Sequence, residues 1–138
     1  MVSVKVLGLD VGDARIGVAV AEEGRPFAFG RGWIVRSADA ADVVAVCELA
    51  RAEGTTRVVV GLPRRSDGAE GAQAAKVRRF AAALGAAGLE VRFVDERYTT
   101  RVAAQRIAHL PRNKRREKGR LDEAAAVAIL ETYLEGGS

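Results

Sequence analysis

The chain has 138 residues, of which 49% are hydrophobic and 29% charged, and its formal net charge is +4. We expect one soluble globular domain over residues 1–138, because a chain of this size can bury about two-thirds of its unfolded surface. No stretch approaches the roughly 20 apolar residues that span a bilayer, and the N-terminus lacks a basic-then-apolar signal pattern. The single Cys47 excludes an intrachain disulfide, so we expect a cytoplasmic protein that is not associated with a membrane.

The first predicted feature is a β-hairpin over Val4–Val20. The Val- and Leu-rich run Val4–Leu9 predicts a strand buried on both faces, Gly12–Arg15 predicts the turn, and Ile16–Val20 predicts the antiparallel return strand. Asp10 ends the first strand, where a carboxylate is costly to desolvate unless it is paired or binds a cation. Two interpretations stay open: chemistry at Asp10, or an aspartate that caps the turn through its own backbone.

The later elements alternate between strands and helices. They are predicted, in chain order, as a strand over Arg25–Val35, a helix over Asp39–Glu53, a strand over Arg57–Gly61, a loop over Leu62–Gly71 leading into a helix that ends near Ala87, a strand over Leu89–Val94, a helix from Thr99 or Thr100 to Leu110, and a final helix over Leu121–Leu134. This order predicts an α/β fold with a mixed five-stranded sheet. An antiparallel meander is followed by parallel strands, with helices on both faces.

The positive charge is concentrated in one segment between Pro111 and Arg120. This segment carries six basic residues and one acid, which leaves the rest of the chain nearly neutral. The basic residues are Arg112, Lys114, Arg115, Arg116, Lys118 and Arg120. Such a dense cluster suits a polyanion, through phosphate contacts and counterion release, and the other interpretation is a solvated linker. We expect the segment to be mobile until nucleic acid binds.

Carboxylates stand at three places where sheet proteins commonly build a site. Asp10 ends the first strand, Asp95 and Glu96 end the fifth, and Asp122 and Glu123 open an otherwise apolar helix. If the first and fifth strands are parallel neighbours, their carboxyl ends meet at one edge, and the last helix can bring Asp122 across it. Crowded carboxylates repel one another, and Mg²⁺ or Mn²⁺ would relieve the repulsion because hard cations take oxygen ligands. Two such ions can activate water and stabilise the leaving oxygen of a phosphodiester.

Each of these groups also has a purely structural interpretation. Asp95 and Glu96 point to opposite sides if strand geometry persists, so only one of them is expected in the site. Asp122 can instead stabilise a helix N-terminus through the helix dipole. The loop that carries Arg64 and Arg65 could hold a phosphate near its backbone N–H groups, although it lacks a GxxxxGK[ST] pattern.

Four short motifs, in order and over nearly the whole chain, resemble the YqgF (RuvX) family. They are Leu9-Asp10-Val11-Gly12 with Arg15 to Val20, Val59 to Pro63 with Asp67-Gly68, Asp95-Glu96-Arg97 with Thr99-Thr100, and Lys118 to Asp122 with Ala124-Ala125 and Ile129-Leu130. The resemblance implies a ribonuclease-H-like fold related to Holliday-junction resolvases, and a nuclease for the 5′ end of pre-16S ribosomal RNA. It also implies that Asp10, Glu96 and Asp122 are the metal-binding catalytic acids, with Glu96 favoured over Asp95. Arg64-Arg65-Ser66 departs from the family, which more often has less basic residues there.

The leading hypothesis is a Mg²⁺- or Mn²⁺-dependent nuclease that hydrolyses structured nucleic acid by a two-metal mechanism. Asp10, Glu96 and Asp122 would hold the metal ions. The nucleic-acid backbone would be held by Arg15, Arg64, Arg65, Arg97 and the basic segment.

Two alternatives remain, a resolvase of Holliday junctions or other branched DNA in repair and recombination, and a non-catalytic RNA-binding factor that acts on ribosomal precursor particles. An actin-like ATPase is disfavoured because a chain of this length leaves no second lobe to close over ATP. The sequence leaves open RNA or DNA as substrate, endo- or exonuclease action, the preferred metal, and a monomer or homodimer. It also leaves open whether Asp95 or Glu123 takes the place of its neighbour in the site.

Overall fold

The computed structural model describes residues 4–98 and 118–136, which contain a mixed five-stranded sheet. Its strands are β1 (Lys5–Val11), β2 (Arg15–Glu22), β3 (Ala28–Val35), β4 (Arg57–Leu62) and β5 (Glu90–Asp95). The first three strands form an antiparallel meander, and β4 and β5 continue the sheet in parallel with β1. The strand order is β3-β2-β1-β4-β5, which confirms the predicted mixed sheet.

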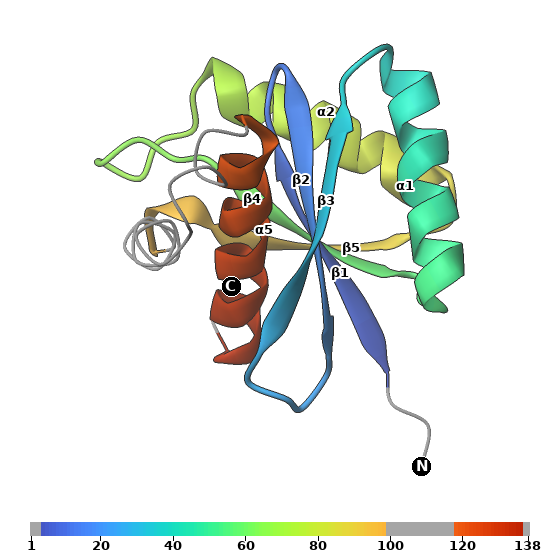
Figure 1. Cartoon of the computed structure of the whole chain (residues 1–138). Coiled ribbons are helices and arrows are strands. Elements are labelled where there is room, and N and C mark those ends of the chain that lie inside the picture. The colour runs from blue at the N-terminus through green and yellow to red at the C-terminus, as the bar shows by residue number, and fades with distance from the viewer. Residues whose placement is uncertain (1–3, 99–117, 137–138) are drawn as a thin grey trace.

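Helices cover both faces of this sheet (Figure 1). They are α1 (Asp39–Glu53), α2 (Ala72–Ala86) and α5 (Lys118–Leu134), with a short 3₁₀ helix over Glu96–Tyr98 directly after β5. Alternate residues of β1 and β4 face opposite sides, so Leu7 and Val58 pack with α1 and α2 whereas Val6 and Val59 pack with α5. The strand of Asp10 is therefore buried on both faces, as its Val- and Leu-rich sequence predicts.

Two glycines determine where α5 crosses the sheet. A Cβ atom at Gly17 of β2 would overlap the backbone of Asp122, and one at Gly8 of β1 would overlap the side chain of Leu130. Because neither position carries a side chain, the helix lies directly against the strands. This close approach is what places Asp122 over the hairpin formed by β1 and β2.

The structure differs from the predicted arrangement in three main respects. Strand β3 begins at Ala28 rather than at Arg25, because Arg25–Phe27 belong to the connection from β2. Strand β4 lies between β1 and β5, so the strands that end in Asp10 and Asp95 are not neighbours. Helix α5 begins at Lys118 rather than Leu121. Asp122 therefore lies more than one turn inside the helix, beyond the first turn where the helix dipole acts most strongly, so the dipole does not account for this acid.

Two further predictions cannot be compared with the structure. The helix predicted from Thr99 or Thr100 to Leu110 lies outside the described residues, and so does the basic segment up to residue 117. Within the described part of the chain, no helix combines the length and apolar character needed to cross a bilayer.

Candidate active site

Asp10 and Glu96 meet across the strand that separates them. A hydrogen bond joins the two side chains, although one residue ends β1 and the other begins the 3₁₀ helix after β5. Gly61 of β4 lies between them, and a Cβ atom there would come within 2.5 Å of Glu96 Oε1. The absence of a side chain at Gly61 thus leaves the space that Glu96 occupies.

The electrostatics of this pair reflect burial and like charge. The pKa of Asp10 is raised to about 8. Burial is the largest cause, and the charge of Glu96, the hydrogen bond with Glu96 and the charge of Asp122 contribute the rest. Burial also raises the pKa of Glu96. The hydrogen bond with Asp10 reduces this rise, and the charge of Asp95 adds to it. Without a cation, the pair thus favours one shared proton at neutral pH.

Asp122 reaches the same edge from α5 but has a cationic partner. The Arg15 side chain donates a hydrogen bond from Nε to Asp122 Oδ2 over 2.8 Å. Arg15, which was predicted to hold nucleic acid, neutralises one of the predicted catalytic acids in this structure. The same carboxylate lies over the β1–β2 turn, where a Cβ atom at Gly12 would be 3.9 Å from Asp122 Oδ1.

The acids suit a divalent cation in their chemistry. Asp10, Glu96 and Asp122 offer carboxylate oxygens. Burial and then the charges of Glu96 and Asp122 raise the pKa of Asp10, and a hard cation would offset both causes. In the described residues, however, no three His, Cys, Asp or Glu side chains converge closely enough to form a complete metal site in this conformation. To bind a metal ion together with Asp10 and Glu96, the Asp122 side chain would have to give up its hydrogen bond with Arg15.

The turn after Asp10 is held by a buried ion pair that no local sequence pattern predicted. Arg36 donates from Nη1 to the Gly12 carbonyl over 2.9 Å and from Nε to Asp42 Oδ2 over 2.7 Å. Burial tends to raise the pKa of Asp42, but the hydrogen bonds from Arg36 and Ser37 lower it overall. Arg36 thereby anchors the β1–β2 turn to the first turn of α1.

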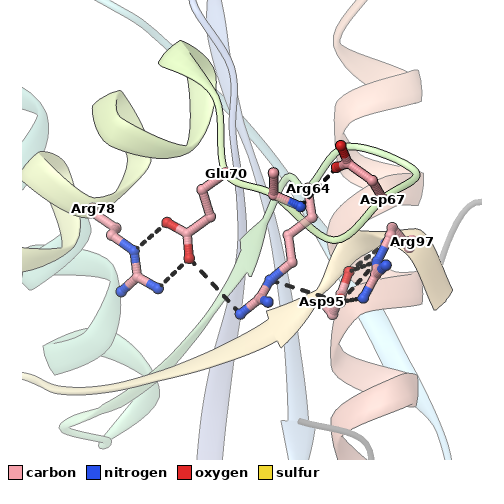
Figure 2. A network of polar contacts seen from close by, with 7 residues as sticks. Arg64, Asp67, Glu70, Arg78, Asp95 and Arg97 are labelled. Atoms are coloured by element: carbon pink, nitrogen blue, oxygen red, sulfur yellow. Dashed lines mark hydrogen bonds and ion pairs between the residues drawn. The ribbon is translucent and has the colours of Figure 1, made fainter.

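Asp95, although adjacent to Glu96, belongs to a separate network of arginines (Figure 2). Arg97 donates to Asp95 Oδ2 from Nη2 over 2.7 Å and from Nε over 3.0 Å, and its backbone N–H donates to Oδ1 over 2.9 Å. Arg64 Nε lies 3.7 Å from the same Oδ2 atom, and its Nη2 lies 3.8 Å from Glu70. The hydrogen bond from the Arg97 side chain is the main cause that lowers the pKa of Asp95.

This network borders an open pocket beside the acids. The pocket has a volume of about 530 Å³ and is lined by Pro63, Arg64, Ser66, Glu96 and Arg97. Two of the predicted nucleic-acid-binding arginines therefore lie next to one of the predicted catalytic acids. The arrangement can place a phosphate between cationic side chains close to Glu96.

The other predicted binding residues have different surroundings. Arg65 is 68% exposed in its side chain and lies 3.6 Å from Asp67. Arg120 packs on the ring of Trp33 and donates to Glu123 over 2.9 Å. Arg112, Lys114, Arg115 and Arg116 lie outside the described residues, and so does the side chain of Lys118.

Glu123 does not take the place of Asp122. Its Oε2 atom accepts a hydrogen bond from the Gly32 backbone N–H over 2.6 Å, and its Oε1 atom accepts the one from Arg120. Glu123 thus attaches α5 to β3. In each pair of adjacent acids, one member has a partner elsewhere. Arg97 donates hydrogen bonds to Asp95, and the Gly32 backbone of β3 donates one to Glu123, which leaves Glu96 and Asp122 on the side of Asp10.

The strand order, with helices on both faces of the sheet, defines a ribonuclease-H-like fold of the kind found in RuvC. Two solved structures of Thermus thermophilus RuvC, one of them in complex with a Holliday junction substrate, superpose with TM-scores of 0.58 and 0.63. The complex covers 96% of this chain and 94% of its own at 17% identity, and the other structure covers 96% and 97% at 19% identity. At such identities the likeness concerns the fold alone.

Sequence relatives specify the family. The family model described as "RuvX: Holliday junction resolvase" matches residues 4–136. A Thermus thermophilus protein named "Putative pre-16S rRNA nuclease" is 53% identical over 133 residues, which cover 96% of this chain and 98% of that protein. A Moorella thermoacetica protein of the same name is 42% identical over 132 residues, covering 95% and 94%. The chain belongs to the RuvX family, which confirms the resemblance seen in its motifs.

Proposed function

We propose that this protein is a metal-dependent nuclease that processes the 5′ end of pre-16S rRNA. The observation that carries the proposal is the hydrogen-bonded pair of Asp10 and Glu96 at the carboxyl edge of the sheet, with Asp122 close enough for its charge to raise the Asp10 pKa. A fold built for structure alone gains nothing from such a repulsive arrangement. The substrate is suggested by the names of the relatives, two of which cover nearly the whole chain.

Asp10, Glu96 and Asp122 would hold the cation, Mg²⁺ or Mn²⁺, as oxygen ligands. When bound, two such ions supply an activated water for attack on phosphorus and stabilise the leaving oxygen. Arg64 and Arg97 bind phosphates of the substrate beside Glu96, because they line the open pocket there.

Arg15 has a further role in this proposal. In the structure it compensates the charge of Asp122 at 2.8 Å. When Asp122 turns towards a cation, the Arg15 guanidinium becomes available for a neighbouring phosphate of the substrate. The same side chain thus stabilises the free protein and contributes to binding the substrate.

The place of action follows from the proposed substrate. A nuclease of pre-16S rRNA acts in the cytoplasm on the precursor transcript or on ribosomal precursor particles. It does so as a monomer or a homodimer, and either state leaves the three acids within one chain.

The test compares cleavage of a pre-16S rRNA fragment with cleavage of a four-way DNA junction, each with and without Mn²⁺. The wild-type protein is expected to cut the RNA only with the metal, and Asp10→Asn, Glu96→Gln and Asp122→Asn each to lose cutting. Asp13→Asn is the matched control, because Asp13 lies in the same turn and its side chain is 68% exposed. RNA cleavage that persists in all three acid variants would refute the proposal.

A second candidate is a resolvase of branched DNA, which the description of the matched family favours. Metal-dependent cutting of the junction with the RNA left intact would support it. Binding of RNA without cleavage of either substrate, by protein free of contaminating nucleases, would instead indicate a non-catalytic assembly factor.

A further inference from the structure

Two phenylalanine side chains are exposed near the edge of the sheet formed by β3. Phe27 and Phe29 keep 64% and 61% of their surface exposed. Arg25 and Arg31, at alternate positions on either side of them, line the same hollow. We call these four residues the Phe27–Phe29 platform. Exposed aromatic side chains that gather in one place usually mark a binding surface.

The hollow is separate from the candidate active site. Its volume is about 410 Å³, and Lys5, Val20 and Glu22 also line it. Lys5 begins β1 and Asp10 lies five residues further along the same strand, which corresponds to about 17 Å at the usual rise of a β-strand. Figure 1 shows that this end of the β1–β3 meander extends beyond α1.

The cations of the platform lie at its rim and remain accessible. The Arg25 side chain is 74% exposed and its Nε lies 3.6 Å from Glu22. The Arg31 side chain is 45% exposed and donates to Glu53 over 3.0 Å, and Lys5 reaches the same carboxylate at 3.4 Å. The three cations outnumber the two carboxylates, so the rim of the hollow keeps a positive charge suited to a phosphate backbone.

The edge of β3 is poorly suited to pairing with a strand of a second copy. The register between β2 and β3 shifts between Gly17 and Ala19, and Gly32 adopts a left-handed φ of 81°. Arg31 adds a charge to the strand. Irregular pairing and charged side chains at an edge are features that prevent strand addition. The observations thus favour a ligand that uses the aromatic faces over one that uses the backbone of the edge.

We propose that the Phe27–Phe29 platform binds unpaired bases of single-stranded nucleic acid. Bases stack on the two phenylalanine rings, while Arg25 and Arg31 contact the flanking phosphates. Aromatic faces interleaved with cations are the combination by which proteins bind single strands with little sequence preference. This inference rests on the proposed function, because the biological ligand of the platform would be the substrate of the nuclease. The platform would bind a single-stranded segment of that substrate next to the cleavage site.

The test measures the affinity of the metal-free protein for fluorescein-labelled oligouridine and for a blunt RNA duplex, by fluorescence anisotropy. Phe27→Ala with Phe29→Ala is expected to weaken oligouridine binding about tenfold or more, as for the loss of stacked aromatic partners. Phe27→Leu with Phe29→Leu is expected to weaken it similarly, because leucine keeps the apolar volume but offers no π face. Binding of the duplex is expected to stay unchanged in both.

The control variant is Val44→Ala, because Val44 is also an exposed apolar residue, at 55%, but lies on α1. It is expected to bind oligouridine like the wild type. Circular dichroism and urea unfolding check that each variant is folded. Oligouridine binding that is unchanged in the alanine variant would overturn the proposal. So would sedimentation showing a dimer that the leucine variant keeps and the alanine variant loses, since the surface would then join two copies.

The outcomes separate this inference from the proposed function. Metal-dependent RNA cleavage together with unchanged oligouridine binding in the alanine variant would refute the platform and leave the nuclease proposal intact. Weakened oligouridine binding together with no cleavage by the wild type would refute the nuclease proposal and leave the platform intact.

Discussion

Asp10 and Asp95 end two parallel strands at one edge of the sheet, with only β4 between them, yet their surroundings are opposite. Asp10 shares a hydrogen bond with a second carboxyl group, and its pKa is raised to about 8. Asp95 accepts hydrogen bonds from the Arg97 side chain and backbone, and its pKa is lowered. The register of the strands puts Asp10 level with Val94 and not with Asp95, so the two side chains leave the sheet on opposite faces. The same residue type at neighbouring positions of one edge is therefore repelled in one case and stabilised in the other.

The difference shows that negative and positive charge are separated along this edge of the sheet. The region of Asp10, Glu96 and Asp122 concentrates negative charge that a cation would relieve. The region of Asp95 concentrates positive charge, because the carboxylate orients Arg97 and lies within 4 Å of Arg64. A scissile phosphate held between these regions would meet acids on one side and arginines on the other. The following predictions test this division, beginning with the largest effect.

Asp10→Asn is expected to lower RNA cleavage by at least about 100-fold while leaving RNA binding nearly unchanged. Loss of groups that only orient metal ligands already costs about 10–100-fold, and Asp10 is proposed as a ligand itself. Single-turnover cleavage and filter binding measure the two quantities separately. Cleavage at the wild-type rate would show that Asp10 is not part of the reacting centre. It would contradict the proposed difference between Asp10 and Asp95.

Gly17→Ala is expected to destabilise the protein by about 1–3 kcal/mol, the usual cost of overpacking, and to weaken metal-dependent cleavage as well. A Cβ atom at this position would overlap the backbone of α5 at Asp122, so the helix must shift. Urea unfolding measures the stability. The control is Gly85→Ala, which has open space around it within α2 and is expected to stabilise by about 0.5–1 kcal/mol.

Asp95→Asn is expected to lower the free energy of unfolding by about 1–2 kcal/mol, because it removes the negative charge that pairs with Arg97. The loss is limited because the Arg97 side chain is partly exposed and can be solvated by water. It is also expected to raise KM for RNA several-fold and to leave kcat nearly unchanged, since it displaces arginines and not the acids. Steady-state kinetics measure both. Asp67→Asn, an exposed residue in the neighbouring loop, is the control. A fall in kcat with unchanged KM would contradict a role in orienting arginines.

The pH dependence of stability in the metal-free protein is expected to have opposite signs for the two aspartates. The folded-state pKa of Asp10 is raised from 3.8 to about 8, so its stabilising contribution is complete below 3.8 and is lost as the pH rises towards 8. The pKa of Asp95 is lowered, so its contribution is present above 3.8 and is lost as the pH falls through the lowered value.

Urea unfolding in the presence of a chelator, compared at several pH values, measures this difference. Each proton contributes a slope of at most about 1.4 kcal/mol per pH unit. Asp10→Asn is expected to reduce the loss of stability between about pH 4 and pH 8. Asp95→Asn is expected to reduce the loss in acid. Identical pH profiles for the two variants would show that the two aspartates do not differ as described.

The amino-acid sequence by itself determined the elements and the edge at which the acids gather. The Val- and Leu-rich run ending in Asp10, the meander and the later alternation of strands and helices all follow from short-range periodicity, which depends on local residue types. Acids that follow parallel strands must lie at one edge, because the carboxyl ends of such strands point the same way. The family resemblance rested on motifs that the sequence also contains.

Only the tertiary structure decided which of these residues are partners. Strand β4 lies between β1 and β5, and Gly61 leaves the space in which Glu96 meets Asp10. Glycine within or near a strand end signals a close approach, but not what approaches it. Arg15 was predicted as a phosphate ligand and lies on Asp122, 107 residues away in sequence. Such pairings depend on strand order and helix position, which are set by packing over the whole chain and not by any local pattern.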